Sequence, residues 1–176
     1  SGVNEICRCV FTKTGDKLFA FSLASGNVKI YTVGSSSLSL TKTITTTVQW
    51  GQGGINKTGT RFVVRNNDTT LTVYDTTNDW TTNTNTSITY PSSRAFALAN
   101  TNTDVYTQRF LELSSNGNTV IVSGFSTTNQ GKVGVYDISD LNSISEIKYL
   151  DDTSGTTDNW LGTNVHCSDM YYAFTA

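Results

Sequence analysis

The chain has 176 residues, the length of a single domain or a piece of a larger one, and a formal net charge of −2. Only 15% of its residues are charged, which argues against a basic surface for nucleic acid, while 36% are hydrophobic, which is too many for a disordered linker. Thr, Ser and Asn contribute 66 residues, 31 of them Thr, and this composition favours strands over helices.

The start of the chain shows no targeting segment. No apolar run approaches the length of about 18 residues that a membrane-spanning helix needs, and no charged-then-apolar segment resembles a signal peptide. The first residue is Ser1 rather than Met, so we expect a processed, truncated or incomplete chain.

An internal repeat organises the sequence. Its copies are VFTKTGDKLFAFSLASGNVKIYTV from Val10 to Val33, INKTGTRFVVRNNDTTLTVYDTT from Ile55 to Thr77, and LELSSNGNTVIVSGFSTTNQGKVGVYDIS from Leu111 to Ser139. Each copy has an apolar strand, a glycine-centred turn, a second apolar strand, a polar turn and a third strand that includes a Tyr. The repeat therefore predicts three equivalent antiparallel units.

The turn glycines are Gly15, Gly59 and Gly117. Thr-Gly or Asn-Gly between alternating apolar runs is a hairpin signal, because glycine accepts the positive φ that a tight hairpin needs. In the closing strands the tyrosines alternate with aliphatic residues, so both faces are apolar and each strand is predicted to lie between neighbours. The aliphatic residues are Val28, Ile30, Leu71, Val73, Val133 and Val135, and the tyrosines are Tyr31, Tyr74 and Tyr136.

The segments between copies predict an outer strand for each unit. The stretches from Leu38 to Val48 and from Ile144 to Leu150 alternate in polarity, as a partly exposed fourth strand does. The insert from Asn78 to Asp104 contains Pro91 and the run RAFALA, and we expect a loop with one strand there. A fourth unit begins at Trp160 and stops after its second strand.

Four-stranded units of this length, with glycine-centred hairpins, are typical of β-propellers. The segments LSSNGNTVIVSG, GKVGVYD and WLGTNV resemble the FG-GAP type of repeat found in integrin α-chain propellers, and WGQGGI matches it loosely. Tryptophan-aspartate repeat propellers are the alternative family, with Tyr74-Asp75 and Tyr136-Asp137 in place of their Trp-Asp. Either resemblance implies an all-β fold with about three and a half blades, over residues 5–48, 49–104, 105–158 and 159–176.

The resemblance does not extend to the calcium sites of FG-GAP hairpins. Those sites need several oxygen ligands with carboxylates among them, and the matching turns here are TKTGD, NKTGT and SSNGN, in which no turn has two carboxylates. We therefore predict no metal in these hairpins, and the sequence indicates no cofactor.

Catalytic residues are sparse. The only histidine, His166, lies between Val165 and Cys167 on a predicted strand and points away from both, which argues against a Cys-His pair. Gly51, Gly53 and Gly54 are expected in a turn that leads into a blade, and Asp151-Asp152 in a solvated turn. Glycoside hydrolysis would need a pair of carboxylates, and the candidates for such a pair are Glu112, Asp137, Asp151, Asp152 and Asp158.

Three cysteines, Cys7, Cys9 and Cys167, are too few for a disulfide scaffold, so we expect them in strands or the core. Trp50, Trp80 and Trp160 lie at or near predicted loops, where tryptophans can stack on sugar rings, although packing between blades is the simpler expectation. Three glycosylation sequons begin at Asn56, Asn67 and Asn85 and matter only in a secreted protein.

We therefore expect a non-catalytic structural or recognition propeller at a virion or cell surface. Its partners would be other protein chains or the remainder of a longer propeller, because an open blade array exposes an apolar face. The alternatives are a glycan-binding propeller that uses Trp50, Trp80 and Trp160, and a propeller hydrolase with carboxylates at the channel mouth.

Overall fold

The structure is a computed structural model, which describes residues 6–22, 26–46, 52–66, 69–77, 80, 83–89, 111–125, 131–151, 165–167 and 171–174. Within these ranges every regular element is a β-strand. The strands form three four-stranded sheets and one two-stranded sheet, and strands that follow each other in sequence lie side by side. All the paired strands are antiparallel, for example β2 with β3 and β10 with β11.

We call the sheets blades 1 to 4. Blade 1 contains β1 (Ile6–Phe11), β2 (Lys17–Ser22), β3 (Asn27–Val33) and β4 (Leu38–Thr45). Blade 2 contains β5 (Gly53–Ile55), β6 (Arg61–Arg65), β7 (Thr70–Thr76) and β8 (Asn83–Thr89). Blade 3 contains β9 (Leu111–Leu113), β10 (Thr119–Phe125), β11 (Gly131–Asp137) and β12 (Ser145–Asp151), and blade 4 contains β13 (Val165–Cys167) and β14 (Tyr172–Phe174).

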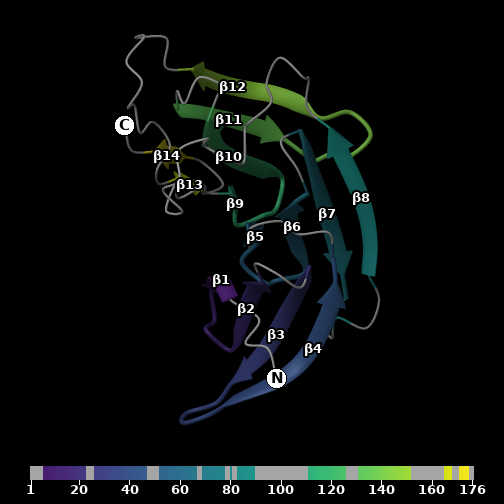
Figure 1. Ribbon diagram of the computed structural model, residues 1–176, viewed down its shortest axis with the longest axis vertical. Coiled ribbons are helices and arrows are strands. Elements are labelled where there is room, and N and C mark those ends of the chain that lie inside the picture. The colour runs from purple at the N-terminus through teal and green to yellow at the C-terminus, as the bar shows by residue number, and fades with distance from the viewer. Residues whose placement is uncertain are drawn as a thin grey trace.

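The blades follow one another along an arc (Figure 1). The first strand of each blade, β1, β5, β9 or β13, lies on the inner side of the arc, and β4, β8 and β12 lie on its outer side. The predicted outer strands at Leu38–Val48 and Ile144–Leu150 are confirmed as β4 and β12, with mostly exposed side chains. The strand expected in the 78–104 insert is β8, whereas Pro91 and RAFALA lie outside the described residues.

The strand registers place one tyrosine at the same point of each of blades 1 to 3. The row of paired residues that contains it, which we call the tyrosine row, is Phe11, Leu18, Tyr31 and Leu40 in blade 1. The corresponding residues are Ile55, Phe62, Tyr74 and Asn85 in blade 2, and Leu113, Val120, Tyr136 and Glu146 in blade 3. Paired residues share a face of an antiparallel sheet, so each row lies on one side of its blade.

Apolar contacts between consecutive blades form the core. Phe19, Phe21, Val28 and Ile30 of blade 1 cluster with Ile55, Phe62, Val64 and Tyr74 of blade 2. Val63, Leu71 and Val73 of blade 2 cluster with Leu111, Leu113, Val120 and Tyr136 of blade 3. Ile121, Val133 and Val135 of blade 3 cluster with Val165 and Cys167 of blade 4. The middle strands are therefore buried on both faces, as their sequence pattern predicts.

Two glycines allow the inner strands to approach closely. A Cβ atom at Gly53 would lie 2.1 Å from the Phe21 ring, and one at Gly54 would lie 3.0 Å from the Cα atom of Glu112. The expectation that these glycines form a turn ahead of the blade is wrong, because both lie within β5. Glycine is needed here for contact between blades, and Gly51 lies outside the described residues.

Arg65, at the end of β6, is fully buried between blades 2 and 3. Its Nη1 atom donates to Gln52 Oε1 at 3.2 Å, ahead of β5, and to the Ser123 carbonyl oxygen at 3.0 Å, on β10. A buried guanidinium is tolerated when acceptors surround it, so Arg65 adds directional contacts to the apolar core. In the described part of the chain no helix is long and apolar enough to cross a membrane.

Candidate functional site

Three inner strands bring charged side chains together. Arg8 comes from β1, Glu112 from β9 and His166 from β13, so the group joins blades 1, 3 and 4. The Oε1 atom of Glu112 lies 3.1 Å from Nδ1 of His166, and Nη1 of Arg8 donates to the Leu111 carbonyl oxygen. We call these three residues the inner-strand cluster.

Strand alternation determines where the acid and the imidazole point. Leu111 and Leu113 are buried on one face of β9, so Glu112 projects from the other face. Val165 and Cys167 are likewise buried while His166 is exposed, which confirms the predicted orientation of the only histidine. The His166 side chain is 72% exposed and the Glu112 side chain 23% exposed, so the pair lies at the edge of the solvent.

Burial changes the acidity of two members of the cluster. Removal from water raises the pKa of Glu112, while the charges of His166 and Arg8, with hydrogen bonds from His166 and the Cys167 backbone, act in the opposite direction. Burial lowers the pKa of Arg8, and the charge of Glu112 opposes that shift. A carboxylate that orients an imidazole is one half of an acid-base catalyst, and no nucleophile is among the three residues.

The glycine-centred hairpins form a second feature, repeated three times. Their first residues are Thr12, Asn56 and Ser114, all buried. In each hairpin the side-chain oxygen of this residue accepts a hydrogen bond from the backbone N–H five residues later, at 3.2, 3.1 and 2.9 Å. The φ angles of Gly15, Gly59 and Gly117 are 74°, 74° and 82°, as the hairpin signal requires.

The hairpins are also joined to each other. The Lys13 N–H donates to the Lys57 carbonyl oxygen at 2.9 Å, and the Lys57 N–H donates to the Ser115 carbonyl oxygen at 3.1 Å. These residues hold the same position in three consecutive turns, so a ladder of backbone hydrogen bonds runs from blade 1 to blade 3. We call the surface formed by these three turns the hairpin rim.

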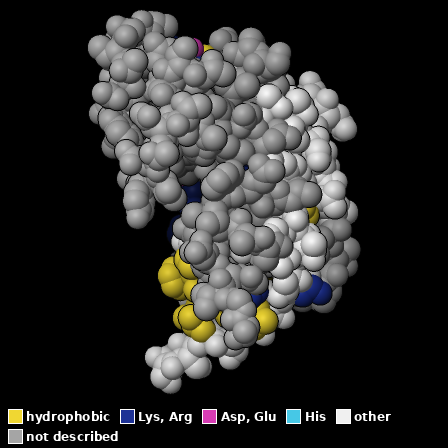
Figure 2. Space-filling view, in the orientation of Figure 1, with side chains coloured by type: hydrophobic (Ala, Val, Ile, Leu, Met, Phe, Trp, Pro, Cys, Tyr) yellow, Lys and Arg dark blue, Asp and Glu magenta, His cyan; other side chains and the backbone are white. Residues whose placement is uncertain are grey.

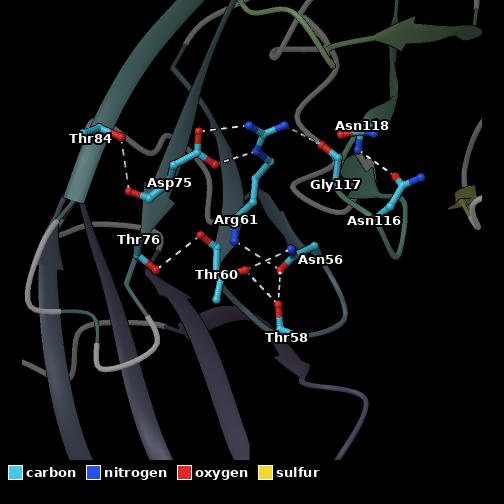
Figure 3. Close-up of polar contacts among 10 residues, drawn as sticks. All are labelled: Asn56, Thr58, Thr60, Arg61, Asp75, Thr76, Thr84, Asn116, Gly117 and Asn118. Atoms are coloured by element: carbon cyan, nitrogen blue, oxygen red, sulfur yellow. Dashed lines mark hydrogen bonds and ion pairs between the residues drawn. The ribbon is translucent and has the colours of Figure 1, made fainter.

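Arg61 links blades 2 and 3 beside this rim (Figure 3). Its Nε and Nη2 atoms donate to the two carboxylate oxygens of Asp75, at 2.6 and 3.0 Å, and Nη1 donates to the Gly117 carbonyl oxygen at 3.1 Å. A bidentate pair of this kind fixes the guanidinium plane. Sequence reasoning missed Arg61, although its position at the start of the second strand, which Lys17 also occupies in blade 1, was a signal that could have found it.

Trp80, one of the three candidate ligand contacts, is only 5% exposed. Its Nε1 atom donates to the Gly59 carbonyl oxygen at 3.1 Å, and its ring packs edge-on against Phe19. Trp80 therefore packs between blades 1 and 2, which was the simpler expectation, and offers no open ring face for a sugar. Trp50 and Trp160 lie outside the described residues.

The described members of the predicted carboxylate set, Glu112, Asp137 and Asp151, lie on different strands. Glu112 lies on an inner strand, whereas Asp137 ends β11 and accepts a hydrogen bond from the Ser139 N–H that lowers its pKa. Asp151 ends β12, 3.8 Å from the Lys132 ammonium, so it belongs to a strand rather than to the expected turn. Asp152 and Asp158 lie outside the described residues. In the described ranges no three His, Cys, Asp or Glu side chains are grouped to hold a metal ion.

The two described cysteine side chains differ in exposure. Cys167 is buried against blade 3, as expected of a core thiol, and Cys9 lies on strand β1 with an exposed side chain. Neither forms a disulfide. The side chain of Cys7 lies outside the described residues.

No protein-family model matches this sequence, and a comparison with curated proteins finds no relative. Solved structures do match. A "putative 6-phosphogluconolactonase" from Bacteroides uniformis has a TM-score of 0.61 at 11% identity, over 97% of this chain and 47% of that one. The RRP9 WD40 repeats have a TM-score of 0.57 at 10% identity, over 85% of this chain and 39% of that one.

The Cps50 (Swd1) β-propeller domain of Myceliophteria thermophila matches as well, with a TM-score of 0.54 at 14% identity, over 82% of this chain and 42% of that one. At such identities the likeness concerns the fold alone, and the all-β fold with propeller blades is confirmed. The chain spans less than half of the length of each of these structures. The FG-GAP assignment stays a prediction from the repeat residues.

Proposed function

We propose that this chain is a non-catalytic recognition module with a β-propeller fold, which binds other protein chains at a virion or cell surface. The observation that carries the proposal is an apolar face of blade 1 that is exposed along its first and fourth strands. We call it the open face, and it carries the exposed Phe11, Leu38 and Leu40, the half-buried Tyr31 and Val33, and the buried Leu18.

Three large side chains of the open face are exposed to solvent. Phe11 and Leu38 are each 56% exposed and Leu40 is 55% exposed. Figure 2 shows apolar side chains gathered over blade 1, in the lower part of the view. Contiguous apolar surface of this kind marks contact sites for other proteins more often than it occurs on a free monomer.

The matched structures agree with a binding role without defining it. Two of them are a WD40-repeat domain and a β-propeller domain, and the propeller fold hosts many unrelated functions. We further infer an FG-GAP type of repeat, a family used in adhesion and assembly, from LSSNGNTVIVSG, GKVGVYD and WLGTNV. This inference depends on the repeat residues and is separate from the structural matches.

Site-specific photocrosslinking tests the binding role. Benzoylphenylalanine in place of Leu40 is expected to crosslink a protein partner in cells that produce the chain. The same probe in place of Ile147, which is 48% exposed on the outer strand of blade 3, is the matched control and is expected to give no such product. Equal crosslinking at both positions, or none at either, would contradict the proposal.

The surface location has a separate test in the sequons. Asn56 is buried, with its Nδ2 atom donating to Thr60 Oγ1 at 3.2 Å, whereas Asn85 is exposed on β8. If the chain is secreted from a eukaryotic cell, Asn85 is expected to carry a glycan and Asn56 is not. Glycosidase treatment followed by peptide mass spectrometry distinguishes the two sites, and an unmodified Asn85 in the protein from its natural eukaryotic source would count against this location.

A hydrolase is the second candidate, because the inner-strand cluster pairs His166 with Glu112. With Nδ1 held by the carboxylate, Nε2 of His166 is the atom that would take a proton from water. One matched structure is named a "putative 6-phosphogluconolactonase", so 6-phosphogluconolactone is the substrate to assay. Turnover that His166→Gln and Glu112→Gln both abolish would support this candidate. Hydrolysis at the buffer rate would exclude it.

A further inference from the structure

We propose that a second copy of this chain covers the open face of blade 1, with the two copies packed face to face about a two-fold axis. The proposal rests on the protein-binding role proposed above and names the partner. It is argued from the tyrosine row, because the same four positions occur in three blades and, among the described residues, only in blade 1 are the first and fourth positions both apolar and exposed.

Blades 2 and 3 show what a neighbouring blade covers. In the tyrosine row of blade 2, Ile55, Phe62 and Tyr74 are buried against blade 1. In blade 3, Leu113, Val120 and Tyr136 are buried against blade 2. A preceding blade therefore covers the first three strands of the row. In blade 1 the equivalent residues are the exposed Phe11, the buried Leu18 and the half-buried Tyr31.

The residue on the fourth strand shows whether a preceding blade or a wider partner fits the open face. The outer residue of the row is Asn85 in blade 2 and Glu146 in blade 3, and both are polar and exposed even though a neighbouring blade is present. Blade 1 has Leu40 at this position, and Leu38 lies beside it opposite Val33. A preceding blade would leave these leucines in water, so the occupant must cover the full width of the sheet.

The open face of a second copy is wide enough to cover the full width of the sheet. Its residues are apolar on all four strands, with Leu18 on β2 already buried, and Lys29 on β3 is the one charged residue on the same side of the sheet among the described positions. Two sheets pack stably when both inner faces are apolar, and an axis parallel to the strands would place β4 of one copy over β1 of the other. Leu40 would then face the partner's Phe11, and both exposed ends of the row would be buried at once.

Sedimentation velocity over a range of concentrations tests the assignment. The purified chain is expected to sediment as a dimer with twice the monomer mass of 19.1 kDa. The double variant Leu38→Asn/Leu40→Asn gives blade 1 the two residues that blade 2 has at these positions, Asn83 and Asn85. Its dimer is expected to be at least about 100-fold weaker, because each substitution occurs twice in a symmetric interface. Ile147→Asn is the matched control and is expected to leave the dimer unchanged.

Several results would overturn the proposal. They are a monomer at every concentration, a dimer that the double variant does not weaken, and a longer natural chain whose own further blades cover the face. The crosslinking experiment separates this failure from a failure of the proposed function. A crosslink between position 40 and a different protein would contradict the proposal that a second copy covers the face, and it would support the binding role. The absence of any crosslinked product would contradict both proposals.

Discussion

The three turn glycines have nearly the same backbone angles but different surroundings. Gly15 has no atom within 4 Å of the place where a Cβ would lie. A Cβ at Gly59 would lie 2.7 Å from two carbon atoms of the Phe19 ring and 3.3 Å from Cγ2 of Thr12. The first glycine is required by its conformation alone, and the second is required also by the contact between blades 1 and 2.

Alanine substitutions separate these two requirements. Gly15→Ala is expected to lower the free energy of unfolding by about 1 to 2 kcal/mol, the cost of a left-handed alanine. Gly59→Ala adds an overpacked contact that costs about 1 to 3 kcal/mol more. Urea unfolding of the two purified variants measures both losses. Equal losses would show that Phe19 moves away from the new methyl group at little cost.

The raised pKa of Glu112 gives a pH dependence of a definite sign. Because the folded chain holds this proton more tightly than the unfolded chain, the carboxyl contributes stability below its ordinary pKa of 4.5. That contribution is lost as the pH rises through the raised value. Glu112→Gln is therefore expected to make the free energy of unfolding depend less on pH in this range. His166→Gln is expected to make it depend more on pH, because His166 opposes the shift.

Thermal unfolding across the acidic range measures this effect as a difference between variants. Asp16 and Asp137 act in the other direction, since hydrogen bonds to Thr14 and Ser139 lower their pKa values. Their contributions are present in all three proteins and cancel in the comparison. Parallel profiles for the wild-type chain and both variants would show that burial of Glu112 has no influence on its acidity.

At the scale of the elements, Arg61 and Lys17 form a natural comparison, because they are the first residues of β6 and β2. Arg61 makes a bidentate pair with Asp75 and reaches blade 3, whereas Lys17 contacts Asp16 at 3.8 Å and Thr32 at 3.1 Å within its own blade. The Lys17 ammonium also lies 5.7 Å from the centroid of the Trp80 ring, so of the two residues only the arginine joins consecutive blades through a hydrogen bond.

Arg61→Ala is expected to cost about 1.5 to 3 kcal/mol of unfolding free energy, because it removes charge-assisted hydrogen bonds from a side chain that is 19% exposed. Arg61→Lys is expected to recover little of this loss, since an ammonium cannot reproduce the planar fork. Lys17→Ala, the matched control, is expected to cost no more than about 1 kcal/mol. Chemical denaturation measures all three, and a full recovery by lysine would contradict the bidentate account.

The elements could be predicted from sequence because their signals are local. Gly15, Gly59 and Gly117 marked hairpins through their neighbours, and alternation of polar and apolar residues marked β4 and β12. The contacts between blades could not be predicted in this way. Trp80 looked exposed beside polar residues, yet it is buried by Phe19, which lies far away in the sequence.

The inner-strand cluster shows the same limit. Period-two alternation correctly oriented His166 relative to its neighbours, and Glu112 was one of five carboxylates considered for glycoside hydrolysis. Alternation does not say which strand a side chain faces, and the pairing of His166 with Glu112 depends on the packing of blade 4 against blade 3. Arg8 left no signal, because its acceptor belongs to a strand two blades away.

At the scale of the whole molecule, the open face makes stability a property of concentration. If two copies bury it, the folded dimer is favoured by mass action, and the Tm of the wild-type chain is expected to rise with protein concentration. Leu38→Asn/Leu40→Asn is expected to have a Tm that does not change. Scanning calorimetry at low and high concentration measures both, and a wild-type Tm independent of concentration would speak against association.

The ladder along the hairpin rim has a consequence for how this surface can change. Its two hydrogen bonds use only main-chain atoms of Lys13, Lys57 and Ser115, so the alignment of consecutive blades does not depend on which side chains those positions carry. Nearly any amino acid except proline, which has no N–H to donate, can be exchanged at Lys13 and Lys57 without loosening the scaffold. The rim is therefore a place where new specificity can evolve, or be engineered, independently of folding.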